Sequence, residues 1–255
     1  MNIALEYISH LMKAKRRHGI HSPFVYDIQD VCLKRHIPKE VIKQRDQLFH
    51  ALASDQTVIQ VSDFGAGSKK LSNNRKIKDI FRHSSSHGKY ADLLFRLGAY
   101  FKPKNILEFG TSLGVGSFHL HFGNPYANIT TVEGCAQTSN TARKHLKEIG
   151  IQNVQFIHST FMDYLQYDNI PCFDLIYIDG HHDGEALKEY VNRLLPHSHA
   201  DTLFILDDIR WSKSMLEAWE FLYSSSDFNL SLDYFRMGIL VRRPQQAKEH
   251  FLLRY

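Results

Sequence analysis

The chain has 255 residues, of which 43% are hydrophobic, and its formal net charge is +4. This length suits one sizeable α/β domain with an appendage, and the sequence contains no apolar run of the roughly 20 residues needed for a membrane span. The N-terminus lacks the features of a secretion signal, and Cys32, Cys135 and Cys172 lack metal-binding spacing. We therefore expect a cytoplasmic protein with reduced thiols and no membrane association.

The charge is unevenly distributed along the chain. Residues 1–110 carry 19 Lys+Arg against 10 Asp+Glu, a balance of +9, whereas the remaining residues have a balance of −5. A basic first part can face an anionic substrate or a nucleic acid, or it can consist of solvated helix faces.

The first hundred residues predict a mainly helical extension. Leu5, Ile8, Leu11 and Met12 recur at helical spacing, and Ser22 with Pro23 forms the capping pattern of a second helix. By contrast, residues 61–88 are rich in Gly, Ser, Asn, Lys and Arg and indicate an irregular polar segment. The expected helices are residues 4–17, a segment that follows Ser22-Pro23, residues 38–60 and residues 89–101.

After Pro103 short apolar strands alternate with helices, a pattern typical of a parallel sheet with right-handed crossovers. Two strand-like runs near the end, 228–234 and 237–243, have hairpin spacing, which predicts an antiparallel C-terminal strand. The other expected strands are 105–109, 128–133, 153–158, 173–179 and 202–207, and the main helices between them are 136–149 and 184–195. We expect an α/β fold with a Rossmann-like, doubly wound, mostly parallel sheet of seven strands.

Two similar glycine-rich stretches compete as the cofactor loop. They are Val61–Lys70 (VSDFGAGSKK) and Ile106–Ser117 (ILEFGTSLGVGS). A nucleotide-like ligand binds where a strand ends, the backbone turns on glycine and a helix begins. The second stretch meets this requirement, and Glu133 lies at the end of the next expected strand, where an acid accepts hydrogen bonds from a ribose diol. We therefore place the cofactor on the second loop.

Four ordered motifs carry a resemblance that covers roughly residues 87–243. ILEFGTSLGVGS, TTVEG, FDLIYIDGHHDG and LFILDDIRW together resemble the class I S-adenosylmethionine-dependent methyltransferases. The resemblance implies that Glu133 holds the ribose and that Asp179 faces the reacting centre. It also implies that the remaining cofactor contacts are Glu108, Gly110, Thr111, Ser112, Gly114, Thr160 and Phe161. The resemblance therefore divides the chain into an N-terminal substrate cap, residues 1–100, and a cofactor-binding domain, residues 101–255.

Three carboxylates follow two of the expected strands. Asp179 ends one strand, and Asp207 with Asp208 ends another, so all three are expected at the same edge of the sheet. Carboxylates gathered in this way repel one another and need protons, basic partners or a cation, and oxygen ligands suit Mg²⁺. The pattern resembles cation-dependent O-methyltransferases of the catechol and caffeoyl-thioester type and of antibiotic-sugar pathways. Asp208 stands at the position where the catechol and caffeoyl-thioester enzymes have Asn.

Two kinds of acceptor chemistry fit these residues. Mg²⁺ held by Asp179, Asp207 and Asp208 would lower the pKa of an acceptor hydroxyl. Alternatively one acid acts as a base while Arg210, His181 or His182 holds the others. Histidine is the side chain best suited to accept a proton near neutral pH, and we favour His182 as the proton acceptor. The predicted catalytic residues are therefore His182, Asp179 and Asp207.

Two segments of the first hundred residues have no role in these motifs. The loop Asp63–Ser68 and the stretch Arg16–Pro23 are polar and turn-rich, and they either bind the acceptor or are structural turns. Lys89 or Tyr90 resembles a contact to the cofactor carboxylate in related enzymes.

The function predicted is methyl transfer from S-adenosylmethionine to a hydroxyl of a small molecule. The alternative is a nucleic-acid methyltransferase that uses the basic first part. The residues Ile178–His182 lack the Asn/Asp-Pro-Pro-aromatic motif of enzymes that methylate base amino groups, which disfavours the alternative. A homodimer is the generic expectation.

Overall fold

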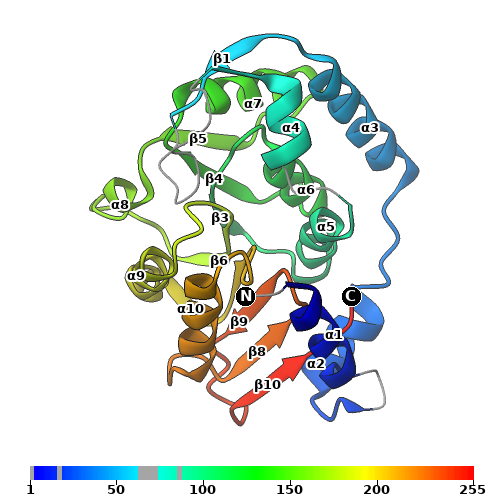
Figure 1. The fold of residues 1–255 in the computed structure, drawn as a ribbon, viewed down its shortest axis with the longest axis vertical. Coiled ribbons are helices and arrows are strands. Elements are labelled where there is room, and N and C mark those ends of the chain that lie inside the picture. The colour runs from blue at the N-terminus through cyan, green and yellow to red at the C-terminus, as the bar shows by residue number, and fades with distance from the viewer. Residues whose placement is uncertain (1–2, 16–18, 63–73, 85–87) are drawn as a thin grey trace. The chain divides into compact units, whose positions relative to one another are not determined.

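The structure is a computed structural model that describes residues 3–15, 19–62, 74–84 and 88–255 (Figure 1). The chain forms two compact units, which we call central and terminal after their positions in the sequence. The central unit comprises residues 32–164 as far as they are described, and the terminal unit comprises residues up to Val31 together with Leu165–Tyr255. The predicted division at residue 100 concerns function and stays a prediction.

The central unit contains three parallel strands, β3, β4 and β5, in that order. They coincide with the predicted strands, and the predicted helices 89–101 and 136–149 are confirmed as α5 and α7. The helices are α3 (Lys39–Ser54), α4 (Ile77–Ser84), α5 (Lys89–Phe101), α6 (Val115–Gly123), α7 (Ala136–Glu148) and α8 (Phe161–Tyr164). The strands are β1 (Val58–Gln60), β2 (Asn74–Lys76), β3 (Asn105–Phe109), β4 (Asn128–Glu133) and β5 (Val154–His158).

The terminal unit contains five strands in the order β10-β8-β9-β7-β6. Its helical elements are α1 (Ile3–Lys13), α2 (Pro23–Asp27), the π-helix η2 (Ile28–Cys32), α9 (Gly184–Leu194), the 3₁₀-helix η3 (Leu195–His197) and α10 (Lys213–Ser224). Its strands are β6 (Phe173–Ile178), β7 (Ser198–Leu206), β8 (Leu230–Asp233), β9 (Gly238–Val241) and β10 (Glu249–Leu252). Strand β9 is antiparallel to both β7 and β8, whereas β7 is parallel to β6 and β10 is parallel to β8.

The predicted fold class is confirmed, with one strand more than expected. The strands β3–β10 belong to an eight-stranded, mostly parallel sheet flanked by helices, and the predicted antiparallel strand is β9. The additional strand is β10, whose apolar residues are confined to the short run Phe251–Leu253 in an otherwise polar C-terminal stretch. It forms because its backbone pairs with β8, from Glu249 opposite Leu230 to Leu252 opposite Asp233.

The expectation of an irregular segment over residues 61–88 is wrong for its second part. Residues 74–84 form β2 and α4, and β2 pairs antiparallel with β1. Helix α4 is highly charged, but Ile77, Ile80 and Phe81 share one face and are buried in the same apolar cluster as Leu48 and Leu52 of α3. A narrow apolar stripe was therefore enough to form a helix that composition alone did not reveal.

Helix α1 forms where it was predicted, but its apolar side chains face outward. Leu5, Ile8 and Met12 are 64%, 53% and 76% exposed. The buried side chain of this helix is His10, whose Nε2 lies 3.0 Å from the Leu253 carbonyl oxygen and whose Nδ1 lies 3.6 Å from Asp233 Oδ1. Polar contacts with the end of the chain thus set which side of α1 packs inward.

Within the described residues, the helices are all too short or too polar to cross a bilayer. The three cysteines are free thiols, with Cys32 and Cys135 buried and Cys172 exposed.

Candidate functional site

The turn after β3 has the backbone that a close ligand approach requires. Gly110, Ser112 and Gly114 all have positive φ, at 100°, 46° and 82°. Gly114 caps α6, and a Cβ there would lie 3.0 Å from Leu146 and 3.1 Å from Ala142 in α7. The turn is therefore fixed by glycine conformation and by tight packing against α7. The other stretch, Val61–Lys70, lies almost wholly outside the described residues, so its predicted role is not addressed by the structure.

The carboxylate of Glu133 is bound to this turn. Strands β3 and β4 place Phe109 opposite Val132, so Glu133 at the end of β4 lies beside the glycine turn. Its Oε2 accepts a hydrogen bond from the Ser112 amide at 2.9 Å, and its Oε1 accepts one from the Cys135 amide at 2.9 Å. Two backbone donors therefore hold the acid in one orientation at the edge of the turn.

Glu108 is the second acid of this region and is fully buried. Its Oε2 accepts a hydrogen bond from the Ser117 hydroxyl, and its Oε1 has no hydrogen-bond partner among the described residues. Burial raises the pKa of Glu108 to about 7, hydrogen bonds from Ser117 and Thr131 work against that rise, and the charge of Glu133 adds to it. A buried carboxyl with an unused oxygen is suited to a cationic ligand group.

The other predicted cofactor residues in the central unit have partners of their own. Thr111 Oγ1 lies 2.6 Å from Thr131 Oγ1, so this hydroxyl ties the turn to β4. Thr160 Oγ1 donates to Asp163 Oδ2 at 2.7 Å. The Phe161 ring stacks on Phe109 with centroids 4.6 Å apart and an interplanar angle of 5°. The structure thus places the second glycine loop, Glu133 and the Thr160–Phe161 segment within one unit.

Lys89 and Tyr90 open helix α5, with the Lys89 ammonium 5.2 Å from the centre of the Tyr90 ring. Their contact with a cofactor carboxylate stays a prediction.

The terminal unit brings the three predicted aspartates together. Ile178 of β6 lies opposite Leu206 of β7, so Asp179 and Asp207 follow paired strand ends. The Tyr177 hydroxyl lies 2.8 Å from Asp179 Oδ2 and 3.3 Å from Asp207 Oδ2.

Arg236 is a member of this cluster that the sequence did not reveal. Its Nε and Nη2 each lie 3.0 Å from an oxygen of Asp207, and its Nε also lies 3.0 Å from Asp208 Oδ1. The residue lies in the turn between β8 and β9, which carries no motif. The pairing register between β7 and β9 would have located Arg236. In that register Gly238 pairs with Leu206, which brings the turn beside Asp207.

The environment of the cluster disfavours ionisation of its acids. Burial and the charges of Asp207 and Asp208 raise the pKa of Asp179 well above its usual value, although Tyr177 and Arg236 oppose the rise. Burial and the charge of Asp207 raise the pKa of Asp208 to about 6, again against Arg236. A single guanidinium therefore compensates the three carboxylates only in part.

His182 lies next to Asp208, and its neighbour His181 does not. His182 Nε2 is 3.9 Å from Asp208 Oδ2, and its ring is 5.4 Å from that of Trp211. His181 Nδ1 instead lies 2.5 Å from the Tyr190 hydroxyl. One ligand atom each from Asp179, His182 and Asp208 lie within 4.8 Å of one another, which is a spacing that can hold a metal ion.

Strained backbone is concentrated around this cluster. Seven non-glycine residues of the described chain have positive φ, and four of them, His181, His182, Asp208 and Phe235, lie in the loops that border it. Such conformations cost free energy and tend to occur at functional sites.

A hollow of about 470 Å³ adjoins the cluster. Asp208 and Arg236 line it on the polar side, and Ile3, Trp211 and Phe235 supply apolar wall. Phe235 is held by the side chain of Arg210, which lies over its ring at 5.0 Å and bonds its carbonyl oxygen at 2.7 Å. Arg210 is in turn paired with buried Asp233 through both of its terminal nitrogens.

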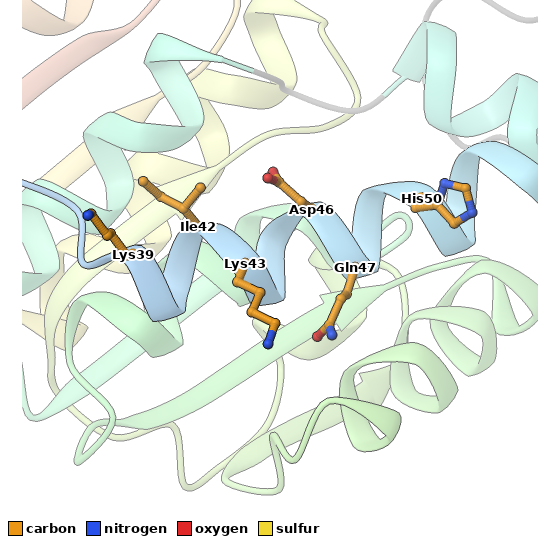
Figure 2. A pocket seen from close by; sticks show the side chains of 6 residues that line it. All are labelled: Lys39, Ile42, Lys43, Asp46, Gln47 and His50. Carbon is orange, nitrogen blue, oxygen red and sulfur yellow. The ribbon is translucent and has the colours of Figure 1, made fainter.

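A second hollow lies along helix α3. All six of its lining residues belong to that helix, and Figure 2 shows their side chains projecting from it. They include none of the predicted site residues, so we assign no site there.

Comparisons with known proteins agree with this geometry. A family model described as a methyltransferase domain matches residues 107–209. Among solved structures, methyltransferase PaMTH1 of Podospora anserina, bound to S-adenosylhomocysteine, has a TM-score of 0.59 at 16% identity, covering 88% of this chain and 96% of that one. An O-methyltransferase from Bacillus cereus, also with S-adenosylhomocysteine, has a TM-score of 0.57 at 17% identity, covering 89% of this chain and 100% of that one.

A further similar structure is the O-methyltransferase TomG from Streptomyces achromogenes, which is involved in tomaymycin synthesis and contains S-adenosylmethionine. Its TM-score is 0.56 at 16% identity, covering 89% of this chain and 99% of that one. No curated protein sequence matches the chain significantly. Residues 107–209 thus resemble a methyltransferase domain, and the chain shares its fold with these methyltransferases.

Proposed function

We propose that the protein transfers a methyl group from S-adenosylmethionine to a hydroxyl group of a small-molecule acceptor. The observation that carries the proposal is the fixed position of Glu133, whose two oxygens are held by the amides of Ser112 and Cys135. An acid oriented beside a glycine turn at the end of the second strand is where a ribose diol is bound in doubly wound folds.

The donor set fits this cofactor at its other groups as well. The buried Glu108 Oε1, with no described hydrogen-bond partner, offers a carboxylate to the cationic amino-acid end. Gly110, Thr111, Ser112 and Gly114 form the turn against which the cofactor lies, and Thr160 with Phe161 borders the adenine. S-adenosylmethionine supplies an activated methyl group, and the contribution of these residues is to bind and orient it.

The acidic cluster and the adjoining hollow support a hydroxylated small molecule as the acceptor. The volume of about 470 Å³ is within the range of small-molecule sites, and its walls combine apolar side chains with Asp208 and Arg236. Similar structures that are named O-methyltransferases favour a hydroxyl over an amine or carbon acceptor.

The acceptor hydroxyl must lose its proton during the reaction. Asp179, Asp207 and His182 are the catalytic candidates, because the raised pKa of Asp179 and the neighbouring imidazole both suit proton transfer. A divalent cation at Asp179, Asp207 and Asp208, such as Mg²⁺, would lower the pKa of that hydroxyl.

The proposal is tested by methyl transfer from labelled S-adenosylmethionine. The full chain is incubated with a panel of catechols, hydroxybenzoates and sugars and, separately, with total RNA. We expect label in the low-molecular-weight fraction, reduced about a hundredfold or more by Asp179→Asn, with cofactor binding retained.

Label in RNA instead of the small molecules would contradict the proposal and favour the basic first part of the chain as a nucleic-acid-binding surface. Equal transfer by wild type and Asp179→Asn would remove the acidic cluster from the reaction.

A further inference from the structure

Strand β1 is bound along its second edge by side chains at the start of α7. Its first edge pairs with β2. On the second edge the Gln60 amide donates a hydrogen bond to Gln137 Oε1 at 2.8 Å. The Cys135 thiol donates to the Gln60 carbonyl oxygen at 3.7 Å and accepts from the Ser62 amide at 3.5 Å. Two side chains therefore satisfy three backbone groups that an edge strand would otherwise leave unpaired.

Cys135 connects this edge of β1 to the acid assigned to the ribose. Its amide donates to Glu133 Oε1 at 2.9 Å, while its buried side chain meets β1. Its carbonyl oxygen accepts hydrogen bonds from the Thr138 hydroxyl at 2.9 Å and the Ser139 amide at 3.1 Å. Because α7 holds the carbonyl and β1 holds the thiol, the amide that orients Glu133 depends on both elements.

The apolar side of β1 packs against the glycine turn. Ile59 is buried in the same apolar cluster as Leu113 and Val115, which flank Gly114. Leu146 of α7, the side chain nearest to a Cβ at position 114, belongs to that cluster as well. Strand β1 is therefore attached to the glycine turn through its apolar side and to the Glu133 turn through its polar edge. These are the two turns assigned to the cofactor.

We propose that the end of β1, residues 60–62, is part of the cofactor site, and that Gln137 is a positioning residue that holds it against the Glu133 turn. The inference rests on the proposed function, because it concerns binding of the same cofactor. It extends the site to a segment that precedes residue 107, where the match to a methyltransferase domain begins. Coupling of this kind is reciprocal, so the cofactor stabilises the β1 contacts and these contacts strengthen cofactor binding.

The first test is calorimetric titration of S-adenosylhomocysteine into variants of the full chain. Gln137→Leu removes the hydrogen-bond acceptor at nearly constant size, and the exposure of Gln137 keeps the core out of the comparison. We expect the affinity to fall about threefold to tenfold, as for the loss of one neutral hydrogen bond. Gln137→Glu retains an acceptor oxygen, and we expect it to bind with an affinity close to that of the wild type.

Asn140→Leu is the matched control. Asn140 is exposed about one turn further along α7, and the same apolar side chain is introduced there. We expect this variant to bind S-adenosylhomocysteine like the wild type. Thermal midpoints of all variants show whether each remains folded, and rescue by Gln137→Glu separates positioning from a general loss of helix stability.

Hydrogen exchange of the wild type is a second test that requires no variant. The Gln60 and Ser62 amides both bond to side chains of the Glu133 turn. We expect them to exchange roughly threefold more slowly, or slower still, when S-adenosylhomocysteine is bound. The Ala127 amide, which bonds Asn124 in the loop before β4, should exchange at the same rate with and without the ligand.

Two outcomes would overturn the inference: equal affinity of the wild type and Gln137→Leu, or unchanged exchange of the Gln60 and Ser62 amides on ligand binding. In both cases the wild type binds S-adenosylhomocysteine, so the proposed function stands and only the role of β1 fails. A folded wild type that does not bind S-adenosylhomocysteine contradicts both.

Discussion

Glu108 and Glu133 are the same residue type in one unit, and their surroundings give them different properties. Glu133 is held by two backbone amides at the edge of the glycine turn, where its charge is stabilised. Glu108 is fully buried, and its carboxyl is shifted toward the protonated form. The contrast follows from position in the strand, because Glu108 lies within β3 whereas Glu133 is the last residue of β4.

The raised pKa of Glu108 predicts a loss of stability as the pH rises. Ionisation begins near pH 4.5 in the unfolded chain but near pH 7 in the folded protein, so the folded state binds more protons between these values. Its free energy of unfolding should therefore fall across that interval, by about 3 kcal/mol at most from this group. Denaturant unfolding of wild type and Glu108→Gln at pH 5 and pH 8 measures the difference.

The variant cannot ionise, so its stability relative to wild type should increase between pH 5 and pH 8. A constant difference between the two proteins would show that Glu108 does not titrate in this range. A ligand ammonium group bound at Glu108 Oε1 should offset the loss of wild-type stability at high pH, since it favours the ionised carboxylate.

The sequence predicts the residues of the site that follow strand ends, and it misses those that come from turns. Glu133, Asp179 and Asp207 were proposed as site residues because parallel strands bring their C-terminal ends together. Arg236 lies in the β8–β9 turn, and its partnership with Asp207 depends on the register between β7 and β9. Register of that kind is set by tertiary pairing, which local spacing does not encode.

At the level of elements, α1 shows that local sequence spacing does not predict how a helix packs. The periodicity of Leu5, Ile8 and Met12 correctly predicts a helix but does not say which face is buried. The structure buries His10 against Leu253 and Asp233, and this leaves the apolar stripe exposed. Helix α4 is the opposite case, in which a polar composition concealed Ile77, Ile80 and Phe81 as a packing face.

Exposure of the α1 stripe predicts that it contributes little to stability. Replacing Leu5, Ile8 and Met12 together with Gln should change the free energy of unfolding by no more than about 1 kcal/mol, because exposed positions lose little on substitution. Urea unfolding followed by circular dichroism measures this change.

Ile28→Ala is the buried control for that experiment. Ile28 is fully buried in the same unit, and its truncation should cost roughly 2–5 kcal/mol. If the triple variant is destabilised as strongly as Ile28→Ala, the outward orientation of the stripe is wrong.

At the scale of the whole molecule, the two units carry different parts of the proposed chemistry. The residues assigned to the cofactor through the glycine turn lie in the central unit, and the acids, Arg236 and the hollow beside them lie in the terminal unit. Alternation of strands and helices predicted the overall class, because each parallel crossover needs a helix. Strand β10 could not be predicted in this way, since its formation depends on β8 rather than on its own apolar pattern.

The central claim is that the cofactor binds at the second glycine turn through Glu133. Isothermal titration of S-adenosylhomocysteine into the wild type, Glu133→Gln and the exposed control Glu148→Gln tests it most directly. We expect one site in the wild type and the control, and affinity weakened about tenfold to a hundredfold in Glu133→Gln, because hydrogen bonds to a charged acceptor are lost. Equal affinity in all three proteins, or no binding by folded wild type, would contradict the account.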